Sequence, residues 1–266
     1  MTQRRPARSR PAAFRVAVVG KGGSGKSVIS GTLSRVLARR GHRVLALDSD
    51  PLPGMGLSIG VDVGDRAMLE GFAERTAEGQ WAIVRNLKPA TVVRRAAVRG
   101  PDGVLFLQFG KVRTSSLQPM MSSLQAFWEV TRNLPRTPWT VVHDLPAGTR
   151  QAFAGWAGTA DVFLLVVEPS HKAMLSARRL AGLRSEVLGA RLVVAANKVR
   201  SEADAAFVAG ALPGADAVAL IPFDPAVAAA DREGVAPIDR SPESPAIRAV
   251  DDLAGRVESL AGRLAV

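Results

Sequence analysis

Short apolar runs alternate along this chain with longer segments in which apolar residues recur every three or four positions. The runs are rich in valine and too short for helices, so they predict buried strands; they cover residues 14–19, 43–48, 139–144, 162–167, 191–196 and 217–221. Helical spacing marks the segments 28–40, 117–134, 173–188 and 245–266. This alternation predicts an α/β fold, a doubly wound and mainly parallel β-sheet with helices on both faces, joined by right-handed crossovers.

The middle of the chain is less regular. The segment Arg66–Arg75 predicts a short helix, whereas 91–98 and 104–109 predict two strands around the turn-forming residues 99–103. The helix predicted over 117–134 carries an apolar stripe that is typical of core packing, formed by Met120, Met121, Leu124, Phe127 and Trp128.

Length and composition narrow the class of protein. The 266 residues, 47% of them hydrophobic, predict one domain over 14–266 after a disordered basic tail, residues 1–13, which holds four arginines and no acid. The absence of cysteine excludes disulfides, thiolate metal sites and cysteine-ligated iron–sulfur clusters. No apolar stretch approaches the ~18 residues of a membrane span, and no signal peptide is recognisable, so we expect a cytoplasmic location.

The stretch Gly20–Ser27 fits the phosphate-binding pattern G-x-x-x-x-G-K-S and lies between a predicted strand and a predicted helix. Its glycines let the backbone curl and turn N–H groups toward phosphate oxygens, beside the positive end of the helix. Lys26 would reach the β- and γ-phosphates, and the Ser27 hydroxyl would hold Mg²⁺. The predicted phosphate-binding residues are Gly22, Gly23, Ser24, Gly25, Lys26, Ser27 and Val28.

Acidic residues follow two other predicted strands. Asp48 and Asp50 end the second apolar run, and Asp144 ends the run at 139–144. Because ligands of open parallel sheets collect beyond the carboxyl ends of the strands, we expect these carboxylates to face the nucleotide. Carboxylate oxygens suit Mg²⁺ and can orient a water molecule for attack on phosphorus. The competing interpretation is that these acids merely form turns.

These motifs resemble the MinD/ParA/nitrogenase-iron-protein family of P-loop ATPases, whose loop reads K-G-G-x-G-K-S/T. The resemblance implies that Lys21 crosses a dimer interface to the partner's nucleotide, so that ATP binding forms a homodimer. It assigns Lys21, Lys26 and Asp50 to catalysis and Ser27, Asp48 and Asp144 to the metal. The sequence Asp144–Gly148 is similar to the second switch, D-x-P-A-G, in which the Gly148 N–H turns toward the γ-phosphate.

The first switch departs from this family pattern. The family usually has Asn or Asp four residues after the switch aspartate, where this chain has Gly54. Coupling of the switch to hydrolysis is therefore an open point, and a nucleotide-binding protein without hydrolysis is one alternative function.

The later strands carry residues that the family uses to bind the base and ribose. By resemblance, Asn197 reads the adenine edge and the Lys198 stem packs on the base, while further contacts come from Pro222, Phe223 and Asp224. The run 221–239 is most similar to the CooC-like ATPases of carbon monoxide dehydrogenase maturation. Those proteins carry a paired-cysteine metal site, where this chain has Thr114–Leu117. Because serine hydroxyls are poor ligands for soft metals, the nickel cargo does not carry over.

The sequence allows two classes of binding partner for such a switch. CooC-like features favour a protein client. The net charge of +11, the basic tail and the basic region 85–113 instead allow a DNA- or membrane-bound positioning ATPase. A charged solvent face is the alternative for 85–113. The last segment, 245–266, lacks the basic face and aromatic anchors of an interfacial helix, and we expect it to dock on the domain.

Overall fold

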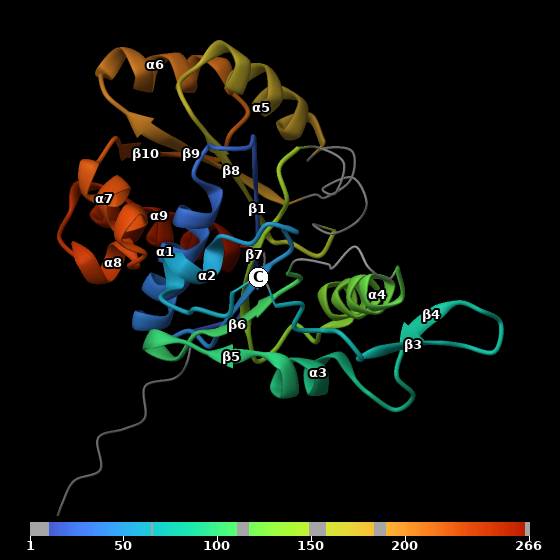
Figure 1. The fold of residues 1–266 in the computed structure, drawn as a ribbon. Helices are drawn as coiled ribbons and strands as arrows, with labels where there is room; N and C mark the ends of the chain where they lie inside the picture. The colour runs from blue at the N-terminus through green and yellow to red at the C-terminus, as the bar shows by residue number, and fades with distance from the viewer. Residues whose placement is uncertain (1–10, 65, 111–116, 149–157, 184–189, 264–266) are drawn as a thin grey trace, which may run out of the picture.

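The structure, a computed structural model, describes residues 11–64, 66–110, 117–148, 158–183 and 190–263 (Figure 1). The strands are β1 (Arg15–Gly20), β2 (Val44–Asp48), β3 (Ala73–Arg75), β4 (Trp81–Ile83), β5 (Val98–Arg99), β6 (Leu105–Gln108), β7 (Thr140–Asp144), β8 (Val162–Val167), β9 (Arg191–Val199) and β10 (Ala217–Pro222). The helices are α1 (Lys26–Arg39), α2 (Met55–Ile59), α3 (Pro89–Ala96), α4 (Leu117–Asn133), α5 (His171–Leu183), α6 (Glu202–Ala211), α7 (Pro225–Glu233), α8 (Pro237–Arg240) and α9 (Pro245–Gly262).

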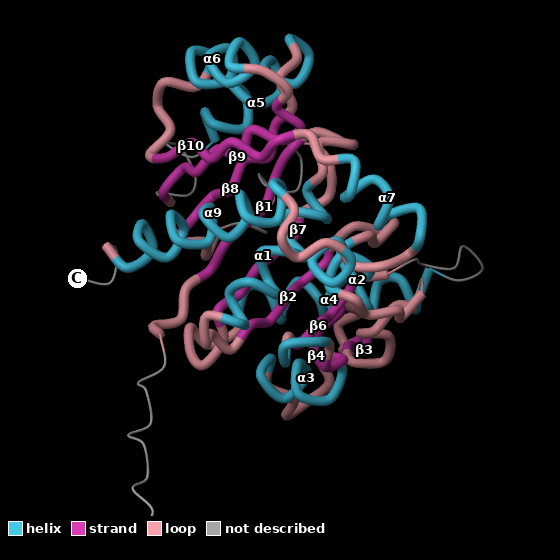
Figure 2. Tube along the Cα trace, turned by 90° about the vertical axis from the view of Figure 1, so that its left-hand side faces the viewer, coloured by secondary structure: helices cyan, strands magenta, loops and turns pink. Residues whose placement is uncertain are grey.

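Eight strands form one sheet in the order β10-β9-β8-β1-β7-β2-β6-β5, as the tube view shows (Figure 2). All neighbours pair in parallel except β5, which runs antiparallel to β6 at the edge. Strand β1 lies between β8 and β7, so the first strand of the chain is central. The predicted doubly wound, mainly parallel α/β sheet is confirmed.

Alternate side chains of the central strands enter two separate cores. Val16 and Val18 pack with α1 and α9, whereas Ala17 and Val19 pack with α4, α5 and α6. Because both faces are covered, the strands are apolar at nearly every position, which is why they appear as continuous valine-rich runs rather than alternating ones. Figure 1 shows these helix layers on the two sides of the sheet.

Two predictions for the middle of the chain are wrong. The segment 91–98 contains helix α3 and only the first residue of the two-residue strand β5. Val92 and Val93 are both buried while the next two residues are both exposed, a pattern that suits a helix, since a strand would alternate. Residues 66–75 form turns instead of a helix, with Gly71 at φ 83°, and end in β3, which pairs with β4 (Figure 1).

The predicted docking of the last segment is confirmed for its described part. Val250, Leu253 and Val257 of α9 are buried against the sheet and α1. Arg40 at the end of α1 bonds to Glu258 of α9 at 2.7 Å. No helix in the described ranges is both long and apolar enough to cross a bilayer.

Some other predictions fall partly on residues outside the described ranges. Helix α5 ends at Leu183, so the predicted part over 184–188 lies outside the described residues, as do tail residues 1–10 and the segment 114–116 that replaces the paired cysteines. Strand β9 continues to Val199, and Asn197 and Lys198 therefore lie inside its end rather than after it. The stripe on α4 is core at Phe127, whereas Met121 is exposed.

Candidate nucleotide-binding site

The sheet order brings the predicted site residues to one edge. The loop after β1, Asp48 at the end of β2 and Asp144 at the end of β7 meet at the carboxyl ends of three adjacent strands. The strand register places Asp48 opposite Asp144, and Asp144 opposite Val18, which lies two residues before Gly20 at the start of the loop. Residues separated by about a hundred positions in the sequence thus share one small region.

The loop backbone has the curled form that the glycine pattern predicts. Gly23 and Gly25 take φ values of 81° and 91°, in the left-handed region that favours glycine. The Ser24 N–H donates to the Lys21 carbonyl at 3.2 Å and closes the turn. A Cβ on Gly25 would lie 2.3 Å from Asn197 Nδ2, so a side chain here would also collide with β9.

The two lysines of the loop differ in environment. Lys26 opens α1 and is buried, with its ammonium 3.5 Å from the Lys21 carbonyl inside the loop. Lys21 is exposed on the outer side. The loop therefore holds one cation within the phosphate cradle and presents the second to solvent, where another molecule can reach it.

The two strand-end carboxylates are buried beside the loop. Asp48 accepts from the backbone N–H groups of Asp50, Gly54 and Met55 at 3.0–3.1 Å. Burial raises the pKa of Asp48 to about 6 despite these bonds. Burial, and next the charge of Asp48, raise the pKa of Asp144 to about 7, although the Ser27 hydroxyl and the Lys26 ammonium favour its ionised form.

This donor set fits a magnesium ion. Asp144 Oδ1 is buried and accepts no hydrogen bond from the described residues. Burial and the neighbouring Asp48 disfavour the negative charge of the Asp144 carboxylate, so a bound cation would stabilise it. A hydroxyl and carboxylate oxygens are hard ligands of the kind Mg²⁺ prefers. No cluster of three or more His, Cys, Asp or Glu side chains forms a metal cage in the described part of the chain.

The first switch is held firmly at its start. Asp50 Oδ1 accepts from the Leu52 N–H at 2.9 Å, an Asx turn. Gly54 is the N-cap residue directly before α2, and a Cβ there would lie 3.5 Å from the Ser27 Cβ. An Asn or Asp at this position would therefore stand directly against the predicted magnesium serine, whereas glycine leaves that space to other groups.

The residues predicted to bind the base are partly used to hold the loop. Asn197 Nδ2 donates to the Ser24 carbonyl at 2.8 Å, and Lys198 Nζ donates to the Gly23 carbonyl at 3.0 Å. Phe223 is partly exposed with the Arg200 guanidinium 3.6 Å above its ring. Asp224 caps α7 through the Ala226 N–H at 2.9 Å and also accepts from α9, so its carboxylate has a structural use beside any contact with ribose.

Residues that sequence reasoning missed support the site from behind. Glu168, after β8, pairs with Lys198 and so fixes the lysine against the loop. Ser49 is buried, and its hydroxyl donates to the Asp144 carbonyl at 2.9 Å, which joins the ends of β2 and β7. Gly148, which the sequence did single out, has φ 106°, and its N–H donates to the Gly20 carbonyl at 3.4 Å, next to the loop. Glu168 could have been predicted as part of the site, because it directly follows a buried strand, as Asp48 and Asp144 end theirs.

The raised pKa values of Asp48 and Asp144 predict how the metal-free protein responds to pH. Unfolded aspartates ionise near pH 4, whereas the folded pair retains its protons up to about pH 6 and about pH 7. Since the folded state binds more protons in this window, the free energy of unfolding should fall as pH rises from 4 to 7, by a few kcal/mol at about 1.4 kcal/mol for each pKa unit. Urea unfolding in EDTA at several pH values measures this; a stability that rises with pH from 5 to 7 would contradict it.

The fold and this loop define a P-loop nucleotide-binding protein of the doubly wound class. The family model described as the CobQ/CobB/MinD/ParA nucleotide binding domain matches residues 16–238, and the chain belongs to this family. The resemblance on which the site was predicted is thereby confirmed.

Similar proteins include the carbon monoxide dehydrogenase accessory protein CooC of Rhodospirillum rubrum. It is 29% identical over 240 residues, which cover 86% of this chain and 91% of that protein. Among solved structures, the septum site-determining protein MinD of Pyrococcus horikoshii OT3, complexed with Mg-ADP, has a TM-score of 0.69 at 21% identity and covers 94% of this chain and 98% of its own. A ParA family ATPase of Chlorobium tepidum has a TM-score of 0.65 at 14% identity, over 91% and 98%. At these identities the structures support the fold.

Proposed function

We propose that this protein is a magnesium-dependent ATPase that switches between monomer and homodimer and acts on a protein client. The observation that carries the proposal is the convergence of the curled loop, the buried Lys26 and the carboxylates Asp48 and Asp144 at one sheet edge. Similarity to an accessory protein of carbon monoxide dehydrogenase supports a protein client.

In this proposal each group has a task. The loop N–H groups and Lys26 bind the phosphate oxygens, and Ser27 with Asp144 and Asp48 would hold Mg²⁺. The ion supplies neutralisation of the phosphate charge when it is bound. Asp50 orients water for in-line attack, the Gly148 N–H meets the γ-phosphate, and Lys21 of a second copy adds charge from outside. Catalysis of this kind is positioning plus electrostatics.

Phosphate release tests the hydrolysis. The wild type should release phosphate from ATP slowly and only with Mg²⁺, and Asp50→Ala should reduce the rate at least about tenfold because the water loses its acceptor. Asp62→Ala, which changes an exposed aspartate of the next loop, is the matched control and should keep the wild-type rate. Equal background rates for the wild type and Asp50→Ala would leave a nucleotide-binding protein without hydrolysis, the alternative that Gly54 raises.

Size analysis tests the switch. The wild type should become dimeric with ATP, and Lys21→Ala should weaken this dimer about tenfold or more while nucleotide binding persists, because Lys26 and the loop amides remain. Lys88→Ala removes another exposed lysine, at the start of α3, and should dimerise normally. A dimer of Lys21→Ala as stable as the wild-type dimer would exclude the crossing role of this lysine.

A second candidate function, attachment to DNA or to an anionic membrane, is favoured by the basic surface around α3. Its members are exposed and make no ion pair within the described residues: Arg85, Lys88, Arg94, Arg95 and Arg99. Duplex DNA bound in this way should dissociate steeply between low and moderate salt. If ATP-loaded protein is retained by neither DNA nor anionic liposomes at low salt, this candidate is excluded.

A further inference from the structure

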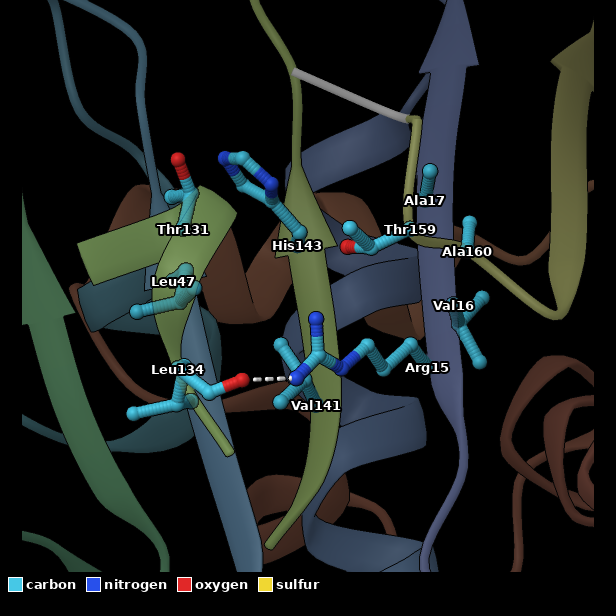
Figure 3. Close-up of a pocket in the computed structure, with 10 residues that line it drawn as sticks. All are labelled: Arg15, Val16, Ala17, Leu47, Thr131, Leu134, Val141, His143, Thr159 and Ala160. Carbon is cyan, nitrogen blue, oxygen red and sulfur yellow. Dashed lines mark hydrogen bonds between the residues drawn. The ribbon is translucent and has the colours of Figure 1, made fainter. Parts of the chain in front are cut away.

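A small cavity lies within the sheet–helix interface on the face that α4 covers. Strands β1 and β7 form its floor, and its lining includes Arg15, Thr131, Leu134, Val141, His143 and Thr159 (Figure 3). Its volume is about 20 Å³, enough for one particle of about the size of a water molecule. Arg15 lies at the amino end of β1, whereas the glycine-rich loop follows its carboxyl end, and Arg15 has no part in the proposed function.

One residue that lines this cavity, Arg15, is unusual because it is a buried arginine; it is the first residue of β1. Only 6% of its surface is exposed. One guanidinium nitrogen donates to the Leu134 carbonyl, and Nε is buried without a hydrogen-bond acceptor among the described residues. Figure 3 shows the guanidinium extending across β7 toward the end of α4, with one nitrogen directed toward the His143 side of the cavity. A guanidinium remains protonated in proteins, so the buried group is a cation.

The charge of this cation is only partly compensated. The nearest acid, Asp161, accepts from the Arg15 backbone N–H at 2.8 Å through Oδ2 and pairs with Arg136 through Oδ1. The Asp161 carboxylate is therefore used by the Arg136 guanidinium and by the Arg15 backbone, and no described carboxylate forms an ion pair with the Arg15 side chain. Desolvation, and next the charge of Arg136, lower the pKa of Arg15, with Asp161 opposing them.

A buried charge without a partner is unfavourable, and two occupants of the cavity would relieve it differently. A water molecule would accept from Nε but leave the positive charge. A monatomic anion would accept from Nε and also cancel the charge, in a setting where the apolar side chains of Ala17, Leu47 and Val141 offer no competing hydrogen bonds. Sulfate and gluconate are much larger than a monatomic anion, so a cavity of about 20 Å³ favours the monatomic one.

We propose that this cavity is a binding site for one small monovalent anion, of the size class of chloride or bromide, held by the guanidinium of Arg15. The anion is a structural ligand that completes the core between β1, β7 and α4. Because it binds only the folded chain, it should stabilise the protein in proportion to the logarithm of its concentration.

Thermal unfolding of the full chain tests this. Sodium chloride should raise the wild-type Tm by about 3 °C over sodium gluconate at equal ionic strength, once chloride is tenfold above its Kd. Arg15→Met keeps an unbranched apolar side chain at this position but removes the guanidinium and its charge, and it should lose the chloride-specific rise. The matched control is Arg191→Met, which changes the arginine that opens β9 but has its charge compensated by Asp216 at 3.3 Å; it should keep the rise.

Crystals grown or soaked with bromide supply a second readout that does not depend on a variant that folds. Anomalous scattering should place bromide within hydrogen-bond reach of Arg15 Nε. A chloride response of the same size in the wild type and Arg15→Met would overturn the proposal. So would a cavity that contains water but no bromide signal at high bromide concentration, since the guanidinium would then be solvated rather than neutralised.

Discussion

Exchange of Lys26 for alanine is expected to lower Mg-ATP affinity and phosphate release by about 100-fold or more. Removal of a single charged or hydrogen-bonding group that stabilises transition-state charge has effects of this order. Lys26 is buried at the first position of α1, and its ammonium lies inside the loop, 3.5 Å from the Lys21 carbonyl. That long bond contributes little to the loop, so the variant should fold and lose binding specifically.

Calorimetry with Mg-ATP and a phosphate-release assay measure the two effects of Lys26→Ala. Lys172→Ala is the matched control, because this lysine is exposed near the start of α5 and should retain wild-type heat and rate. If Lys26→Ala binds ATP with unchanged heat, the phosphate cradle is not where the sequence and the structure place it, and the proposed function loses its foundation.

Asp144→Asn is expected to change stability and activity in opposite directions. In the metal-free protein the buried Asp144 carboxyl faces Asp48, and its raised pKa shows that the charged form is disfavoured. A neutral amide of the same shape should raise the free energy of unfolding at pH 8 by a few kcal/mol, because it removes a charge that the buried site disfavours. Loss of the carboxylate near the ion should reduce magnesium-dependent phosphate release by about 100-fold.

Urea unfolding in EDTA and phosphate release with Mg²⁺ measure these two effects of Asp144→Asn. The pH dependence of stability between pH 5 and 7 should also become shallower, because one of the two high-pKa groups is gone. Asp62→Asn changes an exposed aspartate and should change neither property. A variant that is less stable than the wild type at pH 8 in EDTA would show that Asp144 is stabilising as an anion, contrary to the raised pKa.

Much of the candidate site could be predicted because its chemistry depends on local backbone form. Glycines at 23 and 25 are required by left-handed φ values that the chain pattern already indicates. The strands were found because burial on both faces leaves continuous apolar runs, which no polar face interrupts. Helix α3 was predicted as a strand because adjacent valines are typical of short strands. Only the structure shows that both valines are buried while the next two residues are exposed, which is a helical pattern.

The supporting contacts of the site could not be predicted, since each joins residues that are distant in the sequence. Asn197 holds the Ser24 carbonyl across 173 positions, and Glu168 fixes Lys198. Asp224 was predicted only as a nucleotide contact, and the structure adds that its carboxylate accepts from the first turns of α7 and α9. The sequence does not distinguish an amide or carboxylate that contacts a nucleotide from one that bonds to the protein's own backbone, because the tertiary fold determines which groups lie nearby.

The sequence by itself determined the family, the glycine-rich loop and the order of the central parallel strands, because these follow from residue spacing and from the conformations that glycine alone adopts freely. Only the tertiary structure decided which strands are neighbours, and hence that Asp48 and Asp144 share one buried corner with raised pKa values. The same is true of Arg15, which in the sequence is one of many arginines. Burial and electrostatic repulsion are properties of groups brought together in space, and a linear pattern does not contain those distances.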